Sequence, residues 1–97
     1  MAYKIRNDIV LEKVAGVNML IAKRSAWGTC PFIIEIGPME AYFWKALNDG
    51  EDEKEMLAFA SEKWKVKHST AEKFYSSFIS GIKKNNYLLS GNIENES

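Results

Sequence analysis

Short apolar runs in the first third of the chain are typical of β-strands. They predict a hairpin from Ile5 to Ala22, with a first strand that runs to Val14 and a second strand from Val17. Ala15-Gly16 suits the turn between them, because glycine accepts positive φ without a steric penalty. The near-continuous apolar character of the second strand predicts that it lies at the centre of the sheet.

A third strand is predicted from Cys30 to Ile36, immediately before Gly37-Pro38. Alternation places Ile33 and Glu35 on one face of this strand and Phe32, Ile34 and Ile36 on the other. If the strand forms an edge of the sheet, its unpaired N–H and C=O groups are able to template another chain.

After Pro38 the apolar spacing changes to three and four residues, which predicts helices. The first helix starts at Pro38, where the missing N–H costs nothing, and ends at Gly50, a candidate left-handed terminator. The second helix starts near Asp52, whose side chain suits an N-cap with Glu55 three residues later.

The third helix is predicted to start at Ser69-Thr70-Ala71-Glu72, which has the pattern of a capping box. Its apolar residues cover an arc of about 140°. The residues of this arc are Ala71, Phe74, Tyr75, Phe78, Ile79 and Ile82. We expect the side with Phe74 to pack on the core and the side with Tyr75 and Ile79, followed by Lys83, to overhang the third strand as the wall of a groove.

Three strands followed by three helices make an α+β domain, of the winged helix-turn-helix type with the wing first. The prediction is one domain over residues 1–89, followed by a disordered tail over residues 90–97. No apolar run approaches the length of about 18 residues that a membrane span needs. The single cysteine, Cys30, cannot form an internal disulfide, which favours a reducing cytoplasm.

The net charge is zero, but the charges are sorted along the chain. Residues 35–62 carry a net charge of −6 and residues 63–84 a net charge of +5. A basic face of this kind attracts an acidic peptide without making the whole protein a polyanion binder.

The sequence has no constellation of residues typical of catalysis, which argues against an enzyme. Cys30 and the distant His68 do not make a metal site, and we expect neither a metal nor a cofactor. Trp27, in the loop before the third strand, is a candidate contact with a partner protein, or else it folds back onto the sheet.

The stretch from Ile36 to Gly50 resembles the core of the PqqD-like family, which includes the recognition elements for precursors of ribosomally made, modified peptides. The family pattern is roughly Leu-Ser-Pro-x-Glu-Ala, then an apolar helix, then Leu-Leu-Asp-Gly. The matching residues are Pro38, Glu40, Ala41, Leu47 and Gly50. Ile36 replaces the leucine and Gly37 replaces the serine. The resemblance covers residues 5–89.

This resemblance implies that the domain binds the leader segment of a precursor peptide as an extra strand on the third strand. It then presents the peptide to a maturation enzyme, often a radical SAM enzyme, and performs no chemistry itself. The backbone that would pair with the leader belongs to Phe32, Ile33, Ile34 and Glu35.

The third helix would supply apolar pockets from Tyr75, Phe78, Ile79 and Ile82, and Lys83 would meet carboxylates of the leader. For Phe78 and Ile82 a purely structural place in the core is the favoured interpretation. For Tyr75, Ile79 and Lys83 contact with the peptide is slightly favoured.

Two other functions compete with peptide capture. A winged helix-turn-helix protein would use its third helix to bind nucleic acid, but the acidic middle helices and the lack of arginine after Arg24 argue against it. A homodimer would pair the same open edge with a second copy of the chain.

Overall fold

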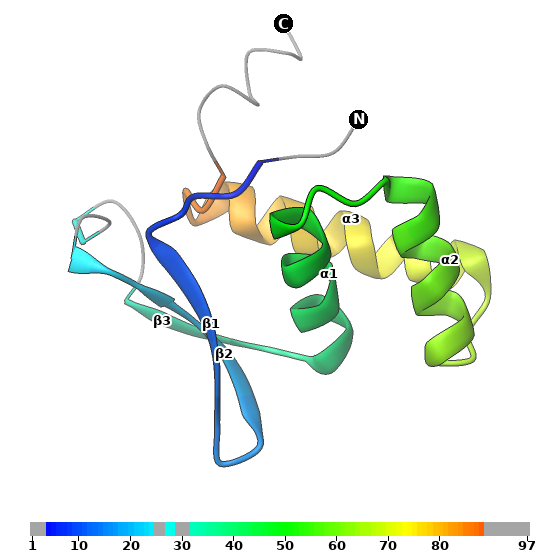
Figure 1. Ribbon diagram of the computed structural model, residues 1–97, viewed down its shortest axis with the longest axis horizontal. Helices are drawn as coiled ribbons and strands as arrows, with labels where there is room; N and C mark the ends of the chain where they lie inside the picture. The colour runs from blue at the N-terminus through cyan, green and yellow to red at the C-terminus, as the bar shows by residue number, and fades with distance from the viewer. Residues whose placement is uncertain (1–3, 25–26, 29–31, 89–97) are drawn as a thin grey trace, which may run out of the picture.

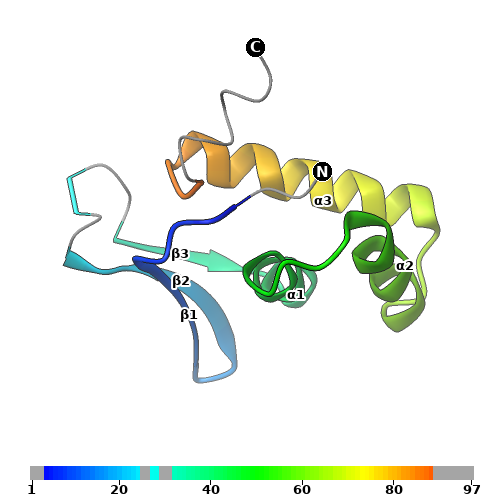
Figure 2. The ribbon, with the colours of Figure 1, turned by 45° about the horizontal axis from the view of Figure 1, so that its top comes forward.

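The computed structural model describes residues 4–24, 27–28 and 32–88, and in these ranges three antiparallel strands precede three helices. The elements are β1 (Ile9–Val14), β2 (Val17–Ala22), β3 (Ile33–Ile36), α1 (Pro38–Asn48), α2 (Glu53–Lys63) and α3 (His68–Lys84). The sheet lies at one end of the molecule, and α1 lies between the sheet and α2 (Figure 1, Figure 2). The predicted fold class is confirmed. None of the described helices is both long and apolar enough to cross a bilayer.

The turn between β1 and β2 fixes the register of the sheet. Ala15 and Gly16 both have positive φ, at +52° and +81°, which is the backbone of a type I′ turn. Val14 therefore faces Val17 across the hairpin. Because a shift of one residue would move every side chain to the opposite face, this turn also decides which residues of the sheet meet the helices.

One face of the sheet packs on the helices and the other carries exposed apolar side chains. Leu20, at the centre of β2, is completely buried, and Ile9 of β1 is buried with it. The opposite face, called the outer face below, includes Val14, Val17 and Ile33, all of them exposed. This division follows from the alternation of side chains along each strand.

Local signals start and stop the first two helices as predicted. Pro38 is the first residue of α1, and Gly50, with φ at +75°, ends the turn that follows this helix. The Asp52 carboxylate accepts hydrogen bonds from the N–H groups of Lys54 (3.0 Å) and Glu55 (3.4 Å). Asp52 is therefore the N-cap of α2, because it satisfies backbone donors that the helix itself leaves without an acceptor.

Aromatic rings join α1 to α3 and to the turn after it. Phe43 of α1 is completely buried, and the ring of Tyr75 of α3 meets it edge to face at a centroid distance of 5.2 Å. The ring of Phe78 lies 6.2 Å from the same Phe43 ring. Trp44, one residue along α1, packs edge to face on Tyr87, beyond the end of α3. Contacts of this geometry add to the free energy of burial.

The capping box predicted at Ser69 is wrong. Helix α3 begins at His68, and its N-cap is Lys67, which makes no side-chain capping hydrogen bond. The connector explains the difference, because the Val66 N–H bonds back to the Ser61 carbonyl (3.0 Å) and the Val66 side chain packs on the core. The chain therefore enters the helix as soon as it leaves Lys67, and Ser69 already lies inside the first turn.

Two further expectations need correction. Strand β3 starts at Ile33 rather than earlier; Cys30 and Pro31 lie outside the described residues, as does the tail over residues 90–97. Phe74, expected on the side of α3 that packs on the core, has 43% of its surface exposed. Apolar spacing alone showed the width of the arc on α3 but not which edge of it the other helices cover.

We predict that replacing Asp52 by alanine lowers the free energy of unfolding by about 1 kcal/mol, because two backbone donors lose their acceptor. Ser69→Ala is the control and should change the free energy of unfolding by less than about 0.5 kcal/mol. Urea unfolding followed by circular dichroism measures both. An equal loss in the two variants would contradict the assignment of the two helix starts.

Candidate peptide-binding site

Strand β3 forms an edge of the sheet, since in the described part of the chain only β2 pairs with it. The Ala22 N–H donates to the Phe32 carbonyl (2.8 Å) at the start of this pairing. Hydrogen-bonded and non-hydrogen-bonded positions alternate along an antiparallel pair, so Ile34 also turns its backbone groups towards β2. Ile33 and Glu35 therefore direct their N–H and C=O groups out of the sheet, at the open edge.

The side chains of β3 divide between the two faces as the sequence predicts. Ile33, with 54% of its surface exposed, and Glu35 lie on the outer face. Ile34 and Ile36 are partly buried and pack against the core beneath the helices. A strand added at this edge would thus insert every second side chain between the sheet and the helices.

The chain just before β1 ties down the end of α3. Ile5 forms an antiparallel bridge with Leu88, and the Arg6 N–H donates to the Tyr87 carbonyl (3.0 Å). Tyr87 is completely buried. These bonds join residues far apart in the sequence and hold the end of α3 to the start of the sheet.

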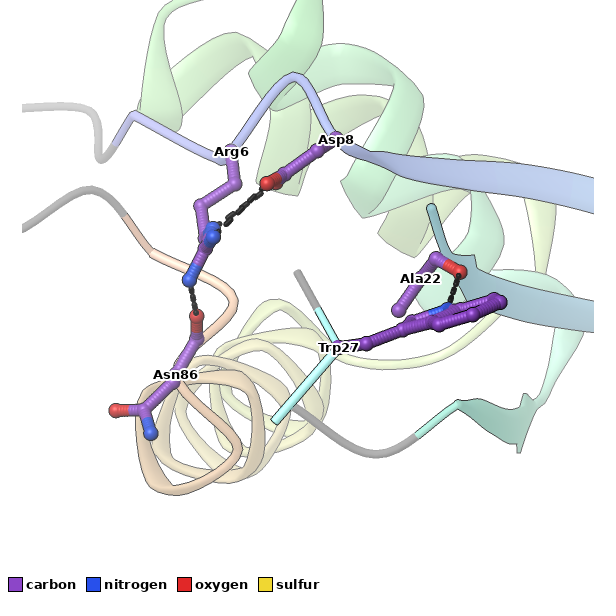
Figure 3. Close-up of polar contacts among 5 residues, drawn as sticks. All are labelled: Arg6, Asp8, Ala22, Trp27 and Asn86. Carbon is purple, nitrogen blue, oxygen red and sulfur yellow. Dashed lines mark hydrogen bonds and ion pairs between the residues drawn. The ribbon is translucent and has the colours of Figure 1, made fainter. Parts of the chain in front are cut away.

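The Arg6 side chain strengthens the same junction, as Figure 3 shows. Its guanidinium binds both carboxylate oxygens of Asp8, at 2.8 and 2.9 Å. A third N–H donates to the Asn86 carbonyl (3.3 Å) in the turn after α3. The two-bond geometry between a guanidinium and a carboxylate fixes the direction of both groups, so this pair orients the turn as well as holding it.

All four apolar candidate residues on α3 lie in the core. The expectation that Tyr75 and Ile79 overhang β3 is wrong, because only 5% and 6% of their surfaces are exposed. Phe78 packs on Phe43, and Ile82 is almost completely enclosed. The structure therefore gives both the structural place that the sequence favoured for them. Their contribution to a peptide site would be to support the helix rather than to form its surface.

Three of the candidates on α3 line a common hollow of about 280 Å³. Its lining residues are Glu53 of α2 and Tyr75, Ser76, Ile79, Ser80 and Lys83 of α3. Tyr75, Ile79 and Lys83, which the sequence singled out, are thus brought together. The lining includes one carboxylate, one ammonium and two serine hydroxyls. It includes no residue of β3, so this hollow is not the groove between β3 and α3 that the sequence predicted.

The loop before β3 contributes an aromatic corner that sequence analysis recognised only in part. The Trp27 indole N–H donates to the Ala22 carbonyl (3.1 Å), so the ring folds back onto the sheet, one of the two alternatives considered (Figure 3). Its ring lies 5.2 Å from that of Phe32, and the Arg24 guanidinium lies 5.5 Å from the Trp27 ring centre. Both rings stay about half exposed at the start of the open edge.

No group of three or more metal-ligating side chains occurs among the described residues. His68 lies 3.7 Å from the Glu72 carboxylate, one helical turn away, and both side chains are exposed. This pair belongs to the first turn of α3 and lies at the opposite end of that helix from Lys83.

Sequence comparison finds no matching family model and no matching curated protein. Two solved structures have the same fold. TbiB1 in complex with the TbiA(beta) leader peptide superposes with a TM-score of 0.69 at 15% identity, over 88% of this chain and 93% of that one. Lasso peptide synthetase B1 complexed with the leader peptide superposes with a TM-score of 0.73 at 18% identity, over 92% of this chain and 99% of that one.

The chain has the fold of these two leader-bound proteins. The likeness covers both the sheet and the three helices, since it spans nearly the whole of each chain. It is a likeness of structure, since the identities are too low to match side chains one by one.

We predict that Trp27→Phe lowers the free energy of unfolding by about 1 kcal/mol, because it removes the indole hydrogen bond to Ala22 and keeps an aromatic ring. Phe32→Leu serves as the control, since it removes the ring contact but keeps the backbone bond. Chemical unfolding measures both. A Trp27→Phe variant as stable as the parent would show that the indole N–H does not hold the loop.

Proposed function

We propose that the chain binds the leader segment of a ribosomally made precursor peptide, as a strand added to β3, and presents it to a peptide-modifying enzyme. The observation that carries the proposal is the open edge at Ile33 and Glu35, in a fold shared with two proteins that hold leader peptides. The domain acts as an adaptor and does no chemistry. In its narrowest form the proposal names a radical SAM enzyme as the partner.

Strand addition supplies the backbone part of the binding energy. Ile33 and Glu35 each offer one N–H and one C=O at the edge, and a hydrogen bond of this kind contributes about 1 kcal/mol net. This is too little to offset the cost of association, which takes several kcal/mol. Side chains of the peptide must supply the rest, at about 1.5–3 kcal/mol for each apolar group that is buried. Micromolar affinity is the expected result.

The register of β3 determines which side chains of the peptide would be buried. A peptide residue directly opposite Ile34 points to the helices, and so do the residues two positions before and after it. We propose that these apolar side chains reach the surface formed by Tyr75 and Ile79, and that Lys83 meets a carboxylate of the leader. Phe78 and Ile82 hold that surface in place from the core.

The two competing functions have less support. Binding of nucleic acid would need a basic recognition surface on α3, and the solved neighbours hold peptides instead. A second copy of the chain is the other candidate for the β3 edge, and its presence would block the leader. The single cysteine of the sequence suits the reducing cytoplasm in which we place the function.

The test is to close one edge of the sheet at a time with proline, which cannot donate a backbone hydrogen bond. Because backbone groups alternate along a strand, one of Ile33 and Ile34 must direct its N–H outward, and in this register Ile33 does so, as does Glu35. We expect Ile33→Pro and Glu35→Pro each to weaken leader binding by about tenfold or more. Lys13→Pro is the matched control, because Lys13 has the same outward position on β1.

Calorimetric titration with a panel of leaders measures these affinities. The panel includes the TbiA(beta) leader and the leader of any precursor peptide encoded beside the gene. Amide spectra check that each variant keeps its fold. Equal affinity in the parent and both β3 variants would refute strand addition. Sedimentation at two protein concentrations separates a monomer from a dimer that uses the same edge.

A further inference from the structure

A second and larger groove lies along β1, at the opposite edge of the sheet from β3. It has a volume of about 1080 Å³ and runs between β1 on one side and α1 and α2 on the other. Residues of all three elements line it, and none of them belongs to β3 or α3. The proposed leader site therefore leaves this groove unused.

The wall on the side of the sheet is an open strand edge. The Lys23 N–H donates to the Asp8 carbonyl (2.8 Å), which sets the alternation of hydrogen bonds along β1 and β2. Ile9, Leu11 and Lys13 therefore turn their N–H and C=O groups away from β2. In the described ranges no other strand pairs with β1, so these three residues offer a row of backbone groups to an added strand.

The wall on the side of the helices is aromatic and partly exposed. The Phe59 ring stacks on the Tyr42 ring, with centroids 4.8 Å apart and planes 27° apart. The Trp64 ring lies 6.1 Å from Tyr42 on the same wall. Phe59 nevertheless has 48% of its surface exposed. An exposed ring held by stacking beside a groove gives an aromatic side chain of a partner a surface on which to pack.

The charges of the groove favour an acidic occupant. Lys13, Lys45 and Lys63 all line it, and the Lys63 ammonium lies 5.5 Å from the Trp64 ring centre. Glu12, the carboxylate among the lining residues, lies at a β1 position whose side chain belongs to the outer face, away from the helices. The lining thus carries three ammonium groups and one carboxylate, which leaves it net positive.

Tyr42 marks one end of this cationic region. Its hydroxyl donates to the Glu51 carboxylate (3.5 Å), and burial, together with the negative charges of Glu51 and Glu55, raises the pKa of Tyr42 above its usual value. The phenol is therefore neutral at physiological pH and already has an acceptor. A carboxylate of the occupant would have to lie towards the lysines instead.

We propose that this groove binds an extended acidic segment of a second protein, which adds to β1 as a strand and places an aromatic side chain against Phe59 and Trp64. An extended peptide can form hydrogen bonds with the outward backbone groups of Ile9, Leu11 and Lys13 on β1, whereas a compact small molecule cannot reach all three. A second copy of the chain would bring the same three lysines, so like charges oppose it. Because β2 separates the two edges, β1 and β3 can be occupied at the same time. The inference does not depend on what binds β3.

The test uses the full chain with Glu35→Pro, which closes the β3 edge, as bait for a phage-displayed library of short random peptides. The most enriched peptide is then synthesised and titrated against variants of the bait. We expect the enriched sequences to combine aspartate or glutamate with an aromatic residue. Lys13→Pro, Lys45→Glu and Phe59→Ala should each weaken binding by about tenfold.

Two matched controls lie outside the groove. Phe74 is a phenylalanine of similar exposure on α3, and Lys73 is an exposed lysine beside it. Phe74→Ala and Lys73→Glu should leave the affinity within about twofold of the parent. Amide spectra of all variants confirm that the fold is kept, so that a lost affinity is not a lost structure.

The outcomes separate cleanly. Three results would each overturn the proposal. They are enriched peptides without acidic residues, an equal loss of affinity in the groove variants and their controls, and no enrichment over bare matrix. Sedimentation of the parent chain tests the remaining occupant. A dimer that Lys13→Pro abolishes would assign the groove to a second copy and overturn the proposal as well. Failure of leader binding at β3 would change none of these results.

Discussion

The hold of Arg6 on the end of α3 is the contact on which the rest of the site depends. Strand β3 and helix α3 are separate elements, and the junction beyond α3 returns that helix to the start of the sheet (Figure 3). The Arg6–Asp8 pair is partly shielded from water and has the two-bond geometry that fixes direction. Tyr87, buried against Trp44, anchors the same turn from inside. The end of α3 is thus held to the start of the sheet by polar contacts and to α1 by aromatic packing.

A three-stranded sheet with helices on one face leaves two edges, and in the described part of the chain no further strand pairs with either. The two edges differ in their surroundings. The β3 edge begins at the half-exposed pair Trp27 and Phe32, whereas the β1 edge faces a cationic groove with Phe59 on its far wall. Backbone groups alone would accept any strand, so the different side chains beside each edge are what can make the two edges selective.

Local chemistry allowed most of the fold to be predicted from the sequence. Pro38, Gly50 and Asp52 each act within a few residues, and the structure confirms all three. The start of α3 was missed because it depends on how the preceding connector packs, which Ser69 does not reveal. For the site, the sequence predicted an open edge at the third strand but could not choose between Ile33 and Ile34, since that choice needs the register set from the neighbouring strand. The β1 groove is formed by β1, α1 and α2 together, so no local sequence pattern predicts it.

Addition of a strand to the sheet would change the surface of its outer face. Val14 and Val17 are exposed at the hairpin end of that face, and Ile33 is exposed at its other end. Side chains alternate along a strand, so half of the residues of a segment added to β3 would extend this face beside Ile33. A loaded molecule would then show the solvent a composite surface, built partly from its cargo, that the empty molecule lacks. If a strand is added to an edge, a protein that binds this face would distinguish the bound form of the chain from the unbound form without touching the groove.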